Sequence, residues 1–124
     1  MENEGYGALS AIAEGVERSH QIGMEELAKR PTAHNDLEDA MRHAEWMRRS
    51  TQETNDLTSR IAGAVHEIDG ILKGQPWSEM IMDLHNNSVG RGAERNNSSV
   101  DPNQLWTLPL KDFQYNPYSI GRRK

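Results

Sequence analysis

The chain has 124 residues, a formal net charge of −5 at pH 7 and no cysteine, and only 35% of its residues are hydrophobic. This length fits one domain with a small core, and the lack of cysteine excludes disulfides, thiolate nucleophiles and cysteine zinc sites. The excess of acidic residues argues against general nucleic-acid binding. No apolar run approaches the roughly 20 residues of a membrane-spanning helix. The acidic first residues predict no signal peptide.

Hydrophobic periodicity predicts an all-α fold. We expect a small helical bundle of about four helices at residues 1–92, followed by a loop and an extended C-terminal arm at residues 93–124. The first helix is predicted over residues 6–19, and residues 24–30 either extend it or form a separate turn before Pro31 stops it. Its inner face is predicted from apolar residues at helical spacing, which are Tyr6, Leu9, Ile12, Ala13 and Val16.

A second helix is expected to begin at Thr32 or Asn35, both good N-caps, with carboxylates in its first turn. Its predicted core face consists of Leu37, Ala40, Met41, Ala44 and Met47. A second face carries Asp39, Arg42, His43 and Trp46 at i, i+3, i+4 and i+7, so this helix should be covered on two sides. Asp39 can either orient the imidazole of His43 for general-base or metal-ligand chemistry or form a plain i,i+4 ion pair.

The third helix is expected over residues 52–73 and has the most regular apolar pattern in the chain. Its predicted core face consists of Leu57, Ile61, Ala64, Ile68 and Leu72. The opposite face carries Gly63, His66 and Gly70, with Glu67 at the edge. Because glycine costs about 1 kcal/mol inside a helix, Gly63 and Gly70 indicate that another backbone or a ligand approaches His66.

The fourth helix should begin near Trp77, and it leads into an unusually polar stretch. Asp83, Asn86, Asn87 and Gly90 fall at i, i+3, i+4 and i+7, which places them on one helical stripe. Asparagine is a poor residue for the interior of a helix. The stripe is therefore either a binding site or the C-terminal cap of the helix, and the pattern leaves both open.

Residues 91–99 have the composition of a loop, and Asp101 with Pro102 is a pattern that can open one helical turn. The arm beyond them combines prolines at 109 and 117 with apolar anchors and has no helical period. These anchors are Leu108, Leu110, Phe113, Tyr115, Tyr118 and Ile120. We expect Trp106–Lys124 to dock in extended form on another subunit of an assembly rather than on its own bundle.

Three blocks of residues together resemble a poorly characterised helical domain. Residues 39–46, 65–67 and 82–91 are similar to its patterns RHAxW, HE and MDLHNNxxGR, in the same order. The domain occurs in phage-encoded proteins and in bacterial secreted or toxin-like proteins. The resemblance implies a helical fold, a bacterial or phage origin, and polar residues that converge in space.

The candidate catalytic residues are His43, His66, Glu67 and Asp83. The candidate binding residues are Asp39, Arg42, Trp46, His85, Asn86, Asn87 and Arg91. Such a set can bind a divalent metal ion through oxygen and imidazole ligands, act as a metal-free acid-base centre in which Glu67 or His43 activates water, or form a buried hydrogen-bond network that only specifies packing. No HExxH zinc motif, phosphate loop or GxSxG elbow is present.

Three classes of function remain from the sequence. The chain is expected to be a virion-associated phage protein, with a site capable of hydrolysing bacterial cell-envelope material. The alternatives are a purely structural assembly protein and a toxin-like hydrolase or toxin-neutralising binding protein. The expected location is the virion or the bacterial host cytoplasm.

Overall fold

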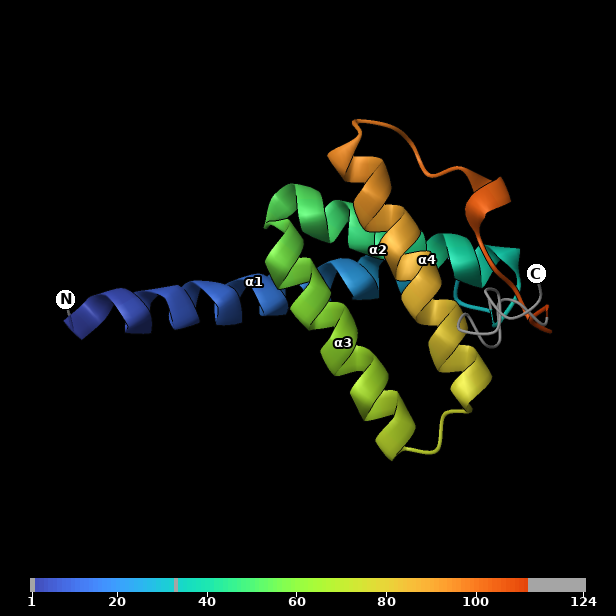
Figure 1. Cartoon of the computed structure of the whole chain (residues 1–124), viewed down its shortest axis with the longest axis horizontal. Coiled ribbons are helices and arrows are strands. Elements are labelled where there is room, and N and C mark those ends of the chain that lie inside the picture. The colour runs from blue at the N-terminus through green and yellow to red at the C-terminus, as the bar shows by residue number, and fades with distance from the viewer. Residues whose placement is uncertain (1, 33, 112–124) are drawn as a thin grey trace, which may run out of the picture.

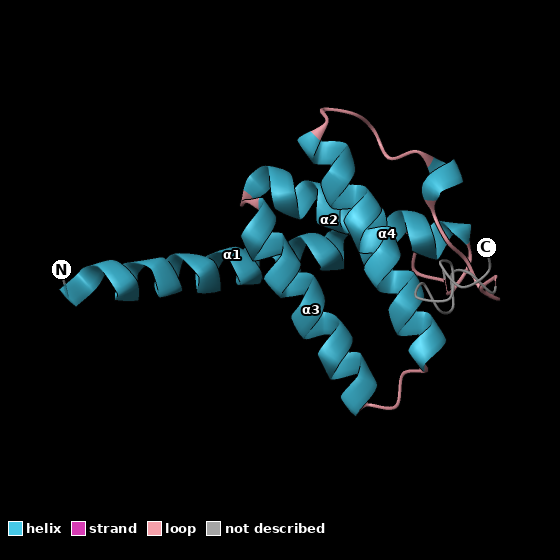
Figure 2. Ribbon diagram, in the orientation of Figure 1, coloured by secondary structure: helices cyan, strands magenta, loops and turns pink. Residues whose placement is uncertain are grey.

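The computed structural model of the chain describes residues 2–32 and 34–111. It contains the helices α1 (Glu2–Lys29), α2 (Leu37–Glu53), α3 (Asp56–Leu72) and α4 (Trp77–Arg95), followed by the short 3-10 helix η1 (Pro102–Gln104) (Figure 1). The described ranges contain no strand, and the rest is loop, between the helices and after η1 (Figure 2). The predicted all-α bundle is confirmed. No helix within the described ranges has the length and apolar character needed to cross a membrane.

Helix α1 is one continuous helix and is longer than the predicted residues 6–19. Its predicted inner face is wrong at the N-terminal half, where the side chain of Leu9 is 68% exposed, whereas Ser19 and Ile22 further along are fully buried. Figure 1 shows the reason, because the first half of α1 extends beyond the other helices. The second half is tied to α2, where Trp46 Nε1 donates a 2.7 Å hydrogen bond to the carbonyl oxygen of Ser19.

Side-chain caps determine where α2 and α3 begin. The Asp36 carboxylate accepts a hydrogen bond from the backbone N–H of Asp39 (2.9 Å), and the Asn55 side chain accepts one from the backbone N–H of Thr58 (2.8 Å). These bonds satisfy N–H groups that have no partner within their helices. Helix α2 is therefore capped one residue after the predicted cap Asn35, and α3 begins at Asp56 rather than at Gln52.

The crossing of α2 and α4 forms the centre of the bundle. Ala40, Ala44, Met47 and Met82 are all fully buried there. A Cβ atom on Gly90 would lie only 2.8 Å from the carbonyl carbon of Ala44, so the two backbones approach too closely for any larger residue. The alternative in which the polar stretch caps α4 is wrong, since the helix continues past it to Arg95. Leu37, predicted in the α2 core face, is 47% exposed.

Helix α3 presents the opposite face to the core from the one that its apolar pattern predicts. Leu57, Ile68 and Leu72 are 59%, 60% and 80% exposed. The buried residues of α3 are instead small or polar, namely Thr58, Ser59, Ala62, Gly63 and Glu67. The physical reason near Gly63 is space, because the close α2–α4 pair leaves room there for small side chains only. A Cβ on Gly63, for example, would lie 3.1 Å from the Asn87 amide nitrogen and 3.3 Å from Met47 Sδ.

The segment after α4 folds back along its own bundle. The Asn86 side chain pairs with the backbone of Trp106, donating to its carbonyl oxygen (2.9 Å) and accepting from its N–H (2.8 Å). The N–H of Leu108 donates to the carbonyl oxygen of Asn35 (3.3 Å). The start of the predicted arm therefore contacts its own bundle. Residues 112–124 lie outside the described residues, so docking on another subunit stays a prediction.

Candidate functional site

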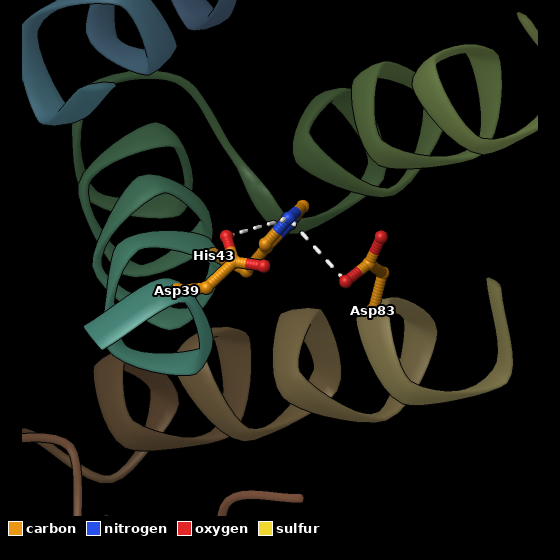
Figure 3. A group of neighbouring side chains, drawn as sticks. All are labelled: Asp39, His43 and Asp83. Carbon is orange, nitrogen blue, oxygen red and sulfur yellow. Dashed lines mark ion pairs between the residues drawn. The ribbon is translucent and has the colours of Figure 1, made fainter. Parts of the chain in front are cut away.

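Three helices bring His43, Glu67 and Asp83 into one buried polar centre. His43 comes from α2, Glu67 from α3 and Asp83 from α4, and their residues are 3%, 2% and 5% exposed. His43 Nε2 lies 3.4 Å from Asp83 Oδ1 and 3.8 Å from Asp39 Oδ1. Figure 3 shows the imidazole between the two aspartates. The predicted convergence of the sequence blocks is confirmed, while the catalytic role of these residues stays a prediction.

Asp39 is held firmly at the start of α2. Its Oδ2 accepts a 2.7 Å hydrogen bond from the backbone N–H of Asn35, and its Oδ1 pairs with the guanidinium of Arg42 one turn along the helix. Its distance to His43 Nε2 is too long for a hydrogen bond. Asp39 therefore contributes charge and a fixed oxygen atom to the centre rather than orienting the imidazole directly.

Several buried polar atoms of the centre have no hydrogen-bond partner among the residues that the structure describes. They are His43 Nδ1 and both amide atoms of Asn87, together with Asp83 Oδ1 and both oxygens of Glu67 wherever no proton pairs these two carboxyl groups. An unpaired buried polar group costs about 1–3 kcal/mol, and buried polar atoms in native proteins are nearly always paired. A proton shared by Glu67 and Asp83 pairs their carboxyl groups with each other, and a polar or ionic ligand could pair with the atoms that remain.

Burial changes the protonation states of this centre. Burial raises the pKa of Asp83 to about 9, and the neighbouring Glu67 carboxyl acts in the same direction. Burial also raises the pKa of Glu67 to about 7. The pKa of His43 falls to about 4 because of burial and the nearby Arg42 guanidinium. At neutral pH the centre therefore holds an uncharged imidazole and at least one proton shared by two carboxyl groups.

The group of Asp39, His43 and Asp83 could hold a metal ion. One ligand atom from each residue lies within 4.8 Å of the others. In a tetrahedral zinc site with bonds of about 2.1 Å, neighbouring ligand atoms lie roughly 3.4 Å apart. The His43–Asp83 distance of 3.4 Å matches this value, and the His43–Asp39 distance of 3.8 Å is slightly longer. An ion would also replace the proton that the carboxyl groups share.

A surface cleft lies beside the centre, between α1, α2 and α3. Two adjoining cavities of about 120 and 290 Å³ share His20, Trp46 and His66 in their walls. The ring centroids of Trp46 and His66 are 5.3 Å apart, and those of His43 and His66 are 6.0 Å apart. His66, with its side chain 53% exposed, lies 3.9 Å from a Glu67 oxygen. His66 thus lies between solvent and the centre, and burial lowers its pKa.

The remaining candidate residues occupy different places. His85 stacks on Trp106 with ring centroids 3.6 Å apart, and its Nε2 donates a 2.7 Å hydrogen bond to the carbonyl oxygen of Gln104. Together with Asn86, His85 therefore fastens the segment after α4. Arg91 Nη1 lies 3.8 Å from Met47 Sδ. The structure does not bring these three residues into the polar centre.

One participant in the centre, Gln75, could not be recognised from the sequence. Its Nε2 donates a 3.0 Å hydrogen bond to Asp83 Oδ2. It comes from the turn between α3 and α4, where Gly74 has φ +94°. Helical periodicity does not extend into turns, so only the fold could reveal this contact.

Comparison with known families identifies one match. A family model described as a domain of unknown function, DUF6973, matches residues 12–114, which is most of the chain. The chain therefore belongs to this family. The match includes the second half of α1 as well as α2 to α4, so the domain begins before the three blocks of the sequence resemblance. No solved structure matches the chain.

Proposed function

We propose that this member of the DUF6973 family is a hydrolase that uses a divalent metal ion bound by Asp39, His43 and Asp83. The observation that supports this most is that one ligand-type atom from each of Asp39, His43 and Asp83 lies within 4.8 Å of the others in a site shielded from solvent. An uncharged imidazole is the protonation state that binds a metal ion. Removing charged carboxylates from water is costly unless a cation compensates for them.

The residues of the chain take different roles in this proposal. A bound ion supplies Lewis-acid polarisation and lowers the pKa of a coordinated water molecule. Glu67, whose pKa burial raises to about 7, is suited to accept a proton near neutral pH. Arg42 fixes Asp39, and Gln75 fixes Asp83, so that both oxygen ligands are held in place.

The biological setting that we propose comes from the resemblance of the sequence blocks. It is a virion-associated phage protein whose substrate is bacterial cell-envelope material. A purely structural assembly protein and a toxin-like hydrolase are the alternatives.

Isothermal titration calorimetry of EDTA-treated protein with ZnCl₂ and MnCl₂ tests whether the centre binds a divalent ion. We expect one site per chain, with release of a proton on binding, and at least tenfold weaker binding by Asp83→Asn. The control is Asp101→Asn, because Asp101 is exposed and caps only η1, and asparagine can keep that cap. Equal affinity of Asp83→Asn and wild type, or no binding by wild type, would refute the metal site.

The hydrolytic step is tested separately, with purified peptidoglycan and with chromogenic ester and phosphodiester substrates. Turnover should require the added ion and should be lost in Glu67→Gln, which keeps the size of the side chain but cannot accept a proton. Turnover by Glu67→Gln at the wild-type rate would exclude Glu67 as the base.

A further inference from the structure

Two apolar helix faces that the sequence pattern assigns to the core are exposed in the structure. The first lies on the N-terminal half of α1, where Leu9 is 68% exposed. The second lies on α3, where Leu72 is 80% exposed. Exposed apolar surface of this extent usually marks a site of interaction with another molecule. Each face therefore calls for a binding partner.

The first half of α1 extends beyond the bundle without packing against it (Figure 1). A Cβ atom on Gly7 would meet nothing within 4 Å among the described residues, whereas one on Gly15 would lie 2.6 Å from Thr58 Cγ2. Residues 2–14 are therefore called the projecting segment. An isolated helix shorter than about 12–15 residues is marginal in water, and glycine weakens it further. The projecting segment would thus be stabilised by a partner.

The projecting segment has the residue spacing of a helix that binds in a groove. Leu9, Ile12 and Ala13 lie at i, i+3 and i+4, and Val16 continues the stripe at i+7, where α1 enters the bundle. This is the anchor spacing with which an amphipathic helix places its apolar face in a hydrophobic groove. Leu9 and Ala13 are exposed, and Ile12 is only partly covered. The stripe is thus available to such a groove.

A groove of the matching chemistry lies between α3 and α4. It has a volume of about 270 Å³, and the surface that it exposes is apolar. Its walls are formed chiefly by apolar side chains of these two helices, which are Ile68, Ile71, Leu72, Trp77, Met80 and Leu84. The wall from α4 includes Trp77, which is 63% exposed. A groove between two helices with apolar walls is the kind of surface that receives a third, amphipathic helix.

We propose that the projecting segment of α1 binds the α3–α4 groove of a second copy of this chain. The groove of the same chain is out of reach, because α1 is one continuous helix whose first half points away from α4 (Figure 1). Each copy carries one segment and one groove, so two copies that exchange their segments leave neither site free. This reciprocal exchange gives a closed, two-fold symmetric dimer. The two apolar faces that the sequence assigns to the core then form one interface.

Sedimentation velocity of the full chain over a range of concentrations tests the proposal. We expect a species of twice the chain mass of 14.0 kDa. Leu9→Lys and Leu72→Glu should each raise the dissociation constant of this dimer at least tenfold, because each would bury an unpaired charge in an apolar interface. Both side chains are largely exposed within one chain, so both variants should stay folded, which circular dichroism checks.

An equimolar mixture of the two variants tests whether the segment and the groove meet. Association should recover in the mixture, because one contact of the mixed dimer is unchanged and the other pairs the introduced lysine with the introduced glutamate. The matched control is Leu57→Glu, since Leu57 is 59% exposed on α3 but does not line the groove. Its dissociation constant should equal that of wild type.

Three results would overturn the proposal. A wild-type chain that stays monomeric at all concentrations would show that a second copy is not the partner. Wild-type association in either Leu9→Lys or Leu72→Glu, or no recovery in their mixture, would show that α1 does not bind the groove. Masses that grow beyond a dimer with concentration would exclude the reciprocal exchange.

Discussion

The protonation of the polar centre predicts an unusual dependence of stability on pH. Burial raises the pKa of Asp83 from its ordinary value of 3.8 to about 9. Between pH 7.5 and 8.5 the folded protein therefore keeps a proton on the Glu67–Asp83 pair, whereas the unfolded chain has released it. Stability falls with rising pH wherever the folded state binds more protons.

The expected size of the effect is set by one retained proton. Each pH unit changes the free energy of unfolding by about 1.4 kcal/mol for one proton, so we expect a loss of about 1.4 kcal/mol between pH 7.5 and 8.5. His43 contributes little in this window. Its pKa of about 4 when folded and its ordinary value of 6.5 both leave it mostly uncharged there.

Urea unfolding in EDTA, followed by circular dichroism at several pH values in this window, measures the slope. Asp83→Asn is the decisive variant, because the amide resembles the protonated carboxyl group and cannot lose its proton. Its free energy of unfolding should be nearly constant across the window. A constant wild-type value, or the same slope in the variant, would show that the folded centre holds no such proton.

Three other substitutions test the packing of the bundle. Gly90→Ala should destabilise the fold by about 1–3 kcal/mol in urea unfolding, because its Cβ would collide with the backbone of Ala44. Gly92→Ala, whose Cβ meets only the end of a side chain at 3.6 Å, should instead gain up to about 1 kcal/mol, and equal effects would contradict the close crossing. Asn86→Ala should cost about 1–3 kcal/mol by removing both hydrogen bonds to Trp106, and an unchanged midpoint would show that this attachment adds no stability.

The sequence predicted the polar centre better than it predicted the core. Asp39 and His43 are one helical turn apart, so their proximity follows from local geometry. The polar stripe of α4 was visible because asparagine is rare inside helices, and Asp83, Asn86 and Asn87 are indeed all buried. The distance between His43 and Asp83 depends on how α2 crosses α4. Local sequence patterns do not predict this crossing.

The orientation of α3 could not be predicted, because periodicity shows which face is apolar but not which partner that face meets. Here the close α2–α4 pair selects the small residues of α3, and most of the apolar stripe is exposed instead. Because α3 turns its small and polar face toward the core, Glu67 and His66 do not lie where the sequence pattern places them. Glu67 is buried in the centre, while His66 is half exposed in the cleft.

The central claim is that Asp39, His43 and Asp83 bind a divalent cation. The most direct measurement is a crystal structure of the protein with ZnCl₂, with an anomalous difference map recorded at the zinc absorption edge. We predict a peak about 2.0–2.2 Å from His43 Nε2 and from one oxygen of Asp83. A zinc peak only at exposed groups such as His34, with the centre closed by direct hydrogen bonds among its own side chains, would contradict the claim.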